Sequence, residues 1–324
     1  MLARAVGPGP AEELDADLCD LAAREGLAPL LGARIARGEI DAGSAGAALA
    51  RAHREELARG LMRERAVRLL GRALAQAGIP WLLLKGAALE RSVYAPGERP
   101  MHDVDVLVPA ARFADAGRLA RGVGAEPLGP ASRPVTGRFE YAAAFALPPG
   151  VGVEIHRAVG PSPLFAVDVA ALFRRASACT DGALVPDATD LFLLLALHAA
   201  KHGFCLPFRS VVDGLRLAAA GTVDRGALVA RARAFRARRA LAAWVGVLES
   251  FGLDADFAAA VRAALPPTAV AAAAMLARSA PWPHDGGGWP RRARIALSVE
   301  GWRGAGWLLL RAALRVADLV AARS

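Results

Sequence analysis

The sequence predicts an α+β protein in which helical segments flank a small mixed β-sheet. Between Arg51 and Ala77, apolar residues recur at the i, i+4, i+7 spacing of an amphipathic helix. Short apolar runs bounded by glycine and proline follow, and the chain after Asp187 is almost wholly helical in pattern. We therefore expect an N-terminal helical segment (residues 1–75), a sheet-containing core (76–185) and a C-terminal helical domain (186–324).

Three helices are expected in the N-terminal segment. Acidic residues open the first, over Ala11–Glu25, and Gly26–Leu31 starts a second, short one. The long amphipathic helix over Arg51–Ala77 should end at Gly78, because glycine commonly terminates helices.

The core should begin with a buried strand that turns directly into a helix. Trp81–Lys85 is a short apolar run followed by Gly86, and a helical segment over Ala87–Tyr94 comes next. A loop rich in proline and glycine leads to the following strand, which carries Asp103 and Asp105. Residues Ala110–Arg121 again have helical spacing.

A β-hairpin is predicted later in the core. Phe139–Leu147 and Val151–Val159 are β-like runs separated by Pro148-Pro-Gly150, a turn signal. Along the second run the apolar residues alternate with Glu154 and His156, so these two side chains should share one face of the sheet. The core should end near Leu184–Pro186.

The paired acids Asp103 and Asp105 are the most informative feature of the chain. Side chains alternate along a strand, so the two carboxylates point to one side and their Cα atoms lie about 6.5 Å apart at about 3.3 Å per residue. Like charges at that spacing repel each other unless a cation lies between them or one carboxylate is protonated. The alternative is a pair of solvent-facing strand residues, but charged pairs are unfavourable on a valine-rich strand. The pattern therefore favours a cation site.

Composition limits the class of protein. The formal net charge of +9 is spread along helices such as Arg231–Arg239, and solvated helix faces explain most of it. Three cysteines without C-x-x-C spacing indicate free thiols in a reducing compartment. The N-terminus shows no secretory signal, and the apolar runs are far shorter than the roughly 20 residues that span a bilayer. A cytoplasmic protein without a membrane partner is expected.

The motifs of the core resemble those of the polymerase β nucleotidyltransferase superfamily, and within it a bacterial group of nucleotidyltransferase family proteins. The resemblance covers most of residues 20 to 220. It rests on the following segments: Gly26–Leu31, Leu84-Lys-Gly-Ala-Ala-Leu89, Tyr94, Arg99-Pro-Met-His-Asp-Val-Asp-Val-Leu-Val108, Val153-Glu-Ile-His156, Leu195-Ala-Leu-His-Ala-Ala-Lys-His202 and Asp213.

The resemblance implies a polymerase β-like core with two-metal chemistry. Asp103, Asp105 and Glu154 would be the catalytic, metal-binding carboxylates, holding two Mg²⁺ ions, or Mn²⁺ in their place. One ion would activate the acceptor oxygen and the other would neutralise the triphosphate and its departing pyrophosphate.

Several further residues are expected at the nucleotide. Gly86 lies where a strand turns into a helix, so phosphate could approach its backbone, although a tight turn alone would also explain a glycine. The superfamily usually has Gly-Ser or Gly-Gly there, whereas this chain has Gly86-Ala87, and Lys85 is expected to supply the missing polarity. Arg99, in the loop before the acids, could contact the triphosphate or be solvated.

Histidines and a lysine complete the expected site. His156 could meet a phosphate or the acceptor, or simply be a hydrogen-bond partner of an acid. Lys201 and His202 match the resemblance and are expected on the nucleotide side. His198, His202 and Cys205 are too few for a closed structural zinc site, which needs four ligands.

The expected function is transfer of a nucleoside monophosphate from an NTP, for example ATP, to an acceptor hydroxyl or phosphate with release of pyrophosphate. A small molecule, peptide or protein is the expected acceptor, because no aromatic stacking platform for nucleic acid is visible. The alternative is a catalytically silent nucleotide-binding or scaffolding partner in a biosynthetic or toxin–antitoxin operon. The sequence identifies neither the acceptor nor the oligomeric state.

Overall fold

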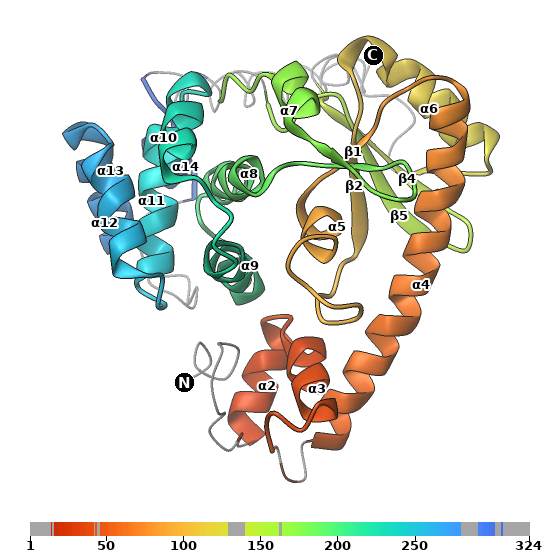
Figure 1. Ribbon diagram of the computed structural model, residues 1–324, viewed down its shortest axis with the longest axis horizontal. Coiled ribbons are helices and arrows are strands. Elements are labelled where there is room, and N and C mark those ends of the chain that lie inside the picture. Colours follow the sequence, from red (N-terminus) through yellow and green to blue (C-terminus); the bar gives the residue numbers. More distant parts are fainter. Residues whose placement is uncertain are drawn as a thin grey trace, which may run out of the picture.

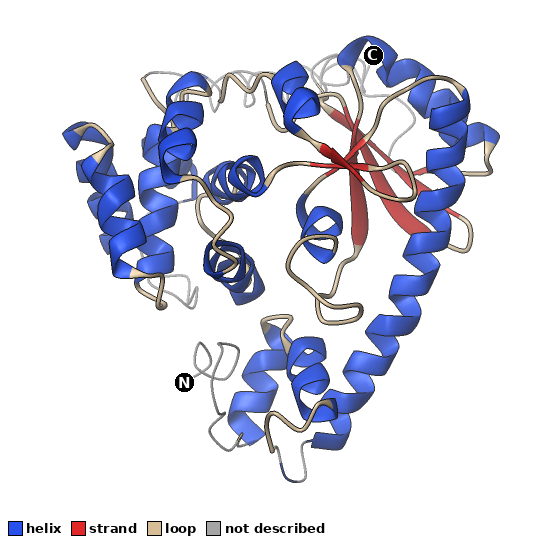
Figure 2. Ribbon diagram, viewed as in Figure 1, coloured by secondary structure: helices blue, strands red, loops and turns tan. Residues whose placement is uncertain are grey.

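The computed structural model describes residues 14, 16–41, 43, 46–128, 140–161, 164–279, 291–301 and 306. It contains helices on both sides of a mixed sheet, in agreement with the predicted α+β class (Figures 1 and 2). The helices are α2 (Ala16–Arg24), α3 (Ala28–Ala36), α4 (Gly46–Gln76), α5 (Lys85–Glu90), α6 (Phe113–Gly122), α7 (Val169–Arg175), α8 (Ala188–Lys201), α9 (Phe208–Ala219), α10 (Arg225–Ala234), α11 (Arg238–Glu249), α12 (Ala255–Ala263), α13 (Pro267–Ser279) and α14 (Arg291–Ser298), with a 3₁₀ turn, η2 (Ala110–Arg112).

Seven strands form one sheet in the order β3-β4-β5-β2-β1-β7-β6. They are β1 (Leu82–Leu83), β2 (Asp103–Leu107), β3 (Glu126–Leu128), β4 (Ala142–Leu147), β5 (Val151–His156), β6 (Ser177–Ala178) and β7 (Leu184–Val185). Strand β2 is antiparallel to β1 and parallel to β5, while β4 and β5 form the predicted antiparallel hairpin. The sheet is therefore mixed, as predicted.

The predicted elements are present with shifted ends. The long helix begins earlier than expected, at Gly46, and the first strand is only Leu82–Leu83 because Lys85 already begins α5. The proposed starts at Ala11 and Phe139 lie outside the described residues. Strands β3, β6 and β7 were not predicted, since they have only two or three residues and show no alternation that could be recognised.

Aspartates fix the starts of four helices after the hairpin. At each start a carboxylate accepts a hydrogen bond from the backbone N–H three residues later, which satisfies one of the unpaired donors of the first turn. These N-cap residues are Asp168 of α7, Asp187 of α8, Asp224 of α10 and Asp254 of α12. Among the described residues, no helix combines the length and apolar character needed to span a bilayer.

The loop between α5 and β2 ties the three parts of the chain together. Glu98, only 3% exposed, accepts hydrogen bonds from Arg37 after α3 and Arg216 of α9, both at 2.8 Å. Burial raises the pKa of Glu98, but the charge of Arg216 and the hydrogen bonds from Arg216, Arg37 and the Ala95 backbone together outweigh it, so the net shift is downward. In Figure 1, α5 lies between the sheet and the helices α8 and α9. The predicted domain boundary near residue 185 falls between β7 and α8.

Close packing of α4 against β1 depends on a glycine. A Cβ added at Gly71 would lie 2.5 Å from Cζ2 of the buried Trp81 ring, which cannot move aside easily. By contrast, a Cβ at Gly60 of the same helix would find only Nη2 of Arg63, at 3.7 Å. The absence of a side chain at Gly71 therefore lets α4 pack closely against the Trp81 ring.

We predict that Gly71→Ala destabilises the protein by about 1 kcal/mol or more, because overpacking outweighs the gain in helix propensity. The matched variant Gly60→Ala should be neutral or stabilising by up to about 1 kcal/mol. Urea unfolding followed by circular dichroism measures both. Equal effects of the two substitutions would contradict the packing argument.

Candidate active site

Two carboxylates face each other across neighbouring strands. Strands β2 and β5 pair in parallel with Asp105 opposite Glu154, so the side chains project from the same face of the sheet. The pairing of the hairpin with the strand of the paired acids, on which the prediction for Glu154 depended, is thus confirmed. Asp105 is only 4% exposed, whereas Glu154 is half-buried.

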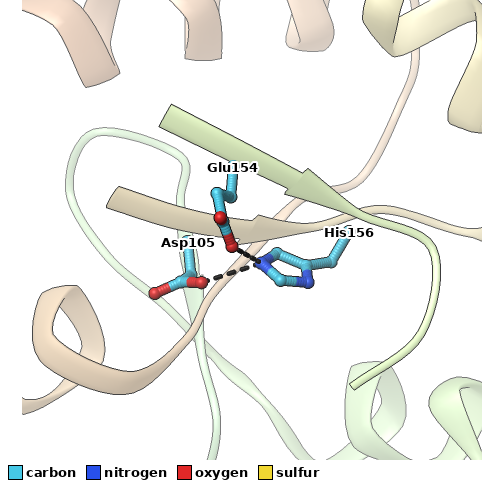
Figure 3. Close-up of side chains that lie close together, drawn as sticks. All are labelled: Asp105, Glu154 and His156. Atoms are coloured by element: carbon cyan, nitrogen blue, oxygen red, sulfur yellow. Dashed lines mark hydrogen bonds and ion pairs between the residues drawn. The ribbon is translucent and has the colours of Figure 1, made fainter. Parts of the chain in front are cut away.

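His156 joins the two acids. Its Nε2 lies 2.7 Å from Oδ1 of Asp105 and 3.2 Å from Oε2 of Glu154 (Figure 3). One ligand atom from each of the three residues falls within 4.8 Å of the others, a grouping that could hold a metal ion. The histidine ring is buried, and its Nδ1 has no hydrogen-bond partner in the described part of the chain. His156 is therefore a hydrogen-bond partner of the acids, one of the alternatives that the sequence left open.

A lysine supplies the second cation at Asp105. Lys85 is the first residue of α5, and its Nζ lies 2.5 Å from Oδ1 of Asp105. Its φ of +47° is unusual for a residue with a side chain, and such backbone strain is most often found at functional sites. The backbone N–H of Leu84 donates to the Asp105 carbonyl at 3.0 Å, which fixes the turn against β2.

Asp103 differs from its neighbour. Its carboxylate is half-buried and stands outside the grouping of Asp105, Glu154 and His156. Burial and the negative charge of Asp105 raise the pKa of Asp103. Because a bound cation would remove that penalty, the raised pKa marks a position that gains from positive charge nearby.

The pKa shifts of the group describe one shared network. Burial raises the pKa of Asp105, but the hydrogen bond from His156 and the charge of Lys85 outweigh it and hold that pKa well below its usual range. Burial lowers the pKa of His156, yet its hydrogen bonds with Asp105 and Glu154 produce a net rise. The hydrogen bond from His156 lowers the pKa of Glu154. Asp105 and Glu154 are thus held ionised.

Gly86 makes room for an arginine. A Cβ at this position would overlap Nη1 of Arg99 and would lie 2.8 Å from Cγ of Met101. The backbone conformation of Gly86 needs no positive φ, so the reason for glycine is this close approach. The next residue, Ala87, is buried and brings no polar side-chain atom to the turn.

Arg99 is anchored by the C-terminal helices. Its Nε and Nη2 donate to the two carboxylate oxygens of Asp213 in α9, at 2.8 and 2.7 Å, and Tyr94 donates its hydroxyl to the same carboxylate at 2.8 Å. Burial lowers the pKa of Arg99, but the charge of Asp213 and its hydrogen bonds with Arg99, together with the nearby Tyr94 and Glu90, produce a net rise. Its Nη1, beside Gly86, has no hydrogen-bond partner among the described residues. The position of Arg99 next to the turn is compatible with its predicted contact with the triphosphate.

Lys201, the last residue of α8, and the C-cap residue His202 lie in two different settings. Lys201 donates to the hydroxyl of Tyr141 at 3.1 Å, and its Nζ lies 5.4 Å from the centre of that ring. The Tyr141 ring is itself 6.0 Å from that of His156, which places Lys201 next to the site. His202, in contrast, contacts Arg291 of α14 at 2.9 Å.

For His198 of α8, the sequence favours a helix residue that faces the cleft or packs, rather than a zinc ligand. Burial and the charges of Lys85 and Lys201 lower its pKa well below the usual value. Its imidazole is therefore neutral within the field of the site. The signal in the sequence was its place in the Leu195–His202 run, one helical turn before His202.

The structure thus combines a mixed sheet that carries acids on the adjacent strands β2 and β5, a lysine at the turn from β1 into α5, and α8 packed against α5. The model of a family described as an uncharacterised nucleotidyltransferase matches residues 12–251, and the chain belongs to this family. The match extends into the C-terminal helices, beyond the region in which motifs could be recognised.

Solved structures show more distant similarity. The solution structure of the antibiotic-resistance factor ANT(2'')-Ia is 12% identical, with a TM-score of 0.41, over 56% of this chain and 95% of that chain. The crystal structure of ANT(2")-Ia in complex with adenylyl-2"-tobramycin is 10% identical, with a TM-score of 0.38, over 53% and 95%. A tRNA-processing enzyme in an apo form is 13% identical, with a TM-score of 0.26, over 59% and 56%. The search of curated proteins finds no match.

We predict that the stabilising effect of His156 depends on pH in metal-free buffer. A histidine whose pKa is raised in the folded state stabilises the protein fully below its unfolded pKa of about 6.5, and this stabilisation is lost as the pH rises through the folded value. His156→Gln should therefore cost more stability at pH 5.5 than at pH 9, measured by urea unfolding with EDTA. The exposed His102, replaced by glutamine, is the control. The same loss of stability at pH 5.5 and at pH 9 would contradict the hydrogen bonds assigned to His156 with Asp105 and Glu154.

The Arg99–Asp213 pair should be a main determinant of stability. Asp213→Asn leaves a buried guanidinium without its countercharge, and breaking such a pair costs about 3–5 kcal/mol. Glu64→Gln removes the solvent-exposed pair of Glu64 with Arg68 and should cost less than about 1 kcal/mol. Chemical denaturation measures the free energy of unfolding of both variants. Equal losses of stability would show that the buried pair contributes no more than the exposed one.

Proposed function

We propose that this protein is a Mg²⁺-dependent nucleotidyltransferase that moves a nucleoside monophosphate from an NTP, such as ATP, to an acceptor hydroxyl or phosphate with release of pyrophosphate. The acceptor is a small molecule, peptide or protein. The observation that carries the proposal is the register of Asp105 against Glu154, with Lys85 on Asp105, in a member of a nucleotidyltransferase family.

The donor set fits divalent cations. Carboxylate oxygens are the ligands that Mg²⁺ prefers, and Asp105 and Glu154 direct theirs to one place. The ammonium of Lys85 lies against Asp105, where a positive charge is stabilised. We propose that Asp103, Asp105 and Glu154 hold two Mg²⁺ ions, with Mn²⁺ as a substitute, and that His156 lies at the edge of their site. When bound, the ions would neutralise the triphosphate and polarise the acceptor oxygen.

The chain's own residues orient the charged groups. His156 keeps a proton at Nε2 between Asp105 and Glu154, which holds both carboxylates in position. Lys85 uses one N–H on Asp105 and has others to donate to a phosphate oxygen. Phosphoryl-type transfer depends mainly on positioning and on stabilising negative charge, so these contacts suit the reaction.

Asp103 and Glu154 are half-buried, whereas Asp105 and His156 are buried. We therefore expect substrates to approach the carboxylates of Asp103 and Glu154. Ala87, Arg99, Lys201 and His202 belong to the proposed nucleotide-binding set together with Lys85, Gly86 and His156.

The direct test is pyrophosphate release with each NTP, Mg²⁺ and a panel of hydroxyl- and phosphate-bearing acceptors. We predict that Glu154→Gln lowers the rate at least about 100-fold, because loss of metal-mediated charge stabilisation is worth several kcal/mol. The exposed Glu126 of β3, replaced by glutamine, is the matched control and should retain the wild-type rate. EDTA should abolish turnover, and added Mg²⁺ or Mn²⁺ should restore it.

Two outcomes would oppose the enzymatic proposal. If the wild-type protein binds NTP but releases no pyrophosphate with any acceptor, a silent nucleotide-binding or scaffolding role is favoured. If it binds no nucleotide in the presence of Mg²⁺, the proposed function fails. Equal activity of Glu154→Gln and the wild type would remove Glu154 from the site.

A further inference from the structure

Arg209 lies one helical turn from the residue that anchors Arg99. It is in the first turn of α9, four positions before Asp213, so the two side chains leave the helix on the same face. Asp213 holds the guanidinium of Arg99, and Nη1 of Arg99 lies against Gly86 at the start of α5. A chain of close contacts thus links the α9 face to the turn that carries Lys85.

The N-terminal segment holds Arg209 in place. Backbone N–H groups at the start of α9 donate to Glu25, that of Phe208 to the carboxylate Oε2 at 2.5 Å and that of Arg209 to the carbonyl at 3.3 Å. A Cβ at Gly26 would lie 2.9 Å from Nη1 and 3.0 Å from Cδ of Arg209, so the side chain passes directly over the glycine. Gly26, with φ of +73°, therefore provides both the turn and the space for this arginine.

Arg209 is a partly buried cation without a countercharge. Within the part of the chain that the structure describes, no carboxylate lies within ion-pair distance of its guanidinium, whereas the neighbouring Arg99 and Arg216 both form ion pairs. Burial and the positive charge of Arg99 lower the pKa of Arg209, while Asp213, Asp103 and Glu56 act in the opposite direction. A half-buried guanidinium beside another cation is unfavourable unless an anion joins it.

We propose that Arg209 binds the phosphate groups of the NTP that leave as pyrophosphate. This inference rests on the proposed function, since it assigns a residue to the same nucleotide. The acids on β2 and β5 would define the place of the reacting phosphate, while Arg209 lies on α9 one helical turn before Asp213, which holds the Arg99 guanidinium at Gly86. A guanidinium suits this role because its planar donors match phosphate oxygens in pairs. The Glu25-Gly26 pair then has a functional purpose, because it positions a phosphate-binding residue.

The test is binding of inorganic pyrophosphate and of nucleoside monophosphate to the full-length protein in the presence of Mg²⁺, by calorimetry. Arg209→Gln should raise the Kd for pyrophosphate about tenfold or more, because hydrogen bonds to charged groups are strong, and should change the Kd for the monophosphate less than twofold. Arg209→Lys keeps the charge and should recover part of the loss. Arg233→Gln removes the same charge from an exposed position of α10 and should leave both constants unchanged.

The outcomes separate this inference from the proposed function. If the wild type binds neither NTP nor pyrophosphate, the proposed function itself fails. If the wild type binds both and Arg209→Gln binds pyrophosphate equally well, only the role of Arg209 is overturned. Equal weakening for pyrophosphate and monophosphate would also overturn it, because a general structural effect would then explain the variant.

Discussion

The enclosure of the Asp105 carboxylate between Lys85 and His156 is the interaction on which the rest of the site depends. A carboxylate that is almost fully removed from water is strongly unfavourable unless it is paired and hydrogen-bonded. Lys85 at the start of α5 and His156 at the end of β5 meet this requirement, because both contact Oδ1 of Asp105. Their positions in turn require the strained backbone at Lys85 and the parallel pairing of β2 with β5.

The helical parts of the chain contribute more than cover for the sheet. Asp213 of α9 fixes Arg99, Glu98 receives arginines from both flanking parts, and Glu25 caps α9. The contacts of Arg99 and Glu98 join distant segments at the loop that precedes β2, and the contact of Glu25 joins the N-terminal segment to α9. These ion pairs are buried or partly buried, so losing one partner leaves a charge in a poorly solvated place. The geometry of the acids is therefore coupled to the packing of helices that carry no acid of the site.

The outline of the fold and the acids on the strands could be predicted because they follow from local patterns. The long amphipathic helix, the hairpin and the alternation of Glu154 with apolar residues are visible in the sequence, and the structure contains all three. The short strands β6 and β7 were missed because they have two residues each, and their position depends on the pairing of β7 with the distant β1 and of β6 with β7. Likewise, nothing local distinguishes Arg209 from the many other arginines of the chain, since its lack of a countercharge depends on its neighbours.

The sequence by itself determined the class of fold, the family resemblance and the identity of the paired acids, because periodicity and motif spacing are properties of neighbouring residues. Only the tertiary structure decided that His156 bridges Asp105 and Glu154, that Gly86 admits Arg99, and that Asp213 holds that arginine. Apart from the pair of His156 with Glu154 in β5, these are contacts between different segments of the chain. Their distances depend on how strands pair and helices pack, and no local pattern encodes that arrangement.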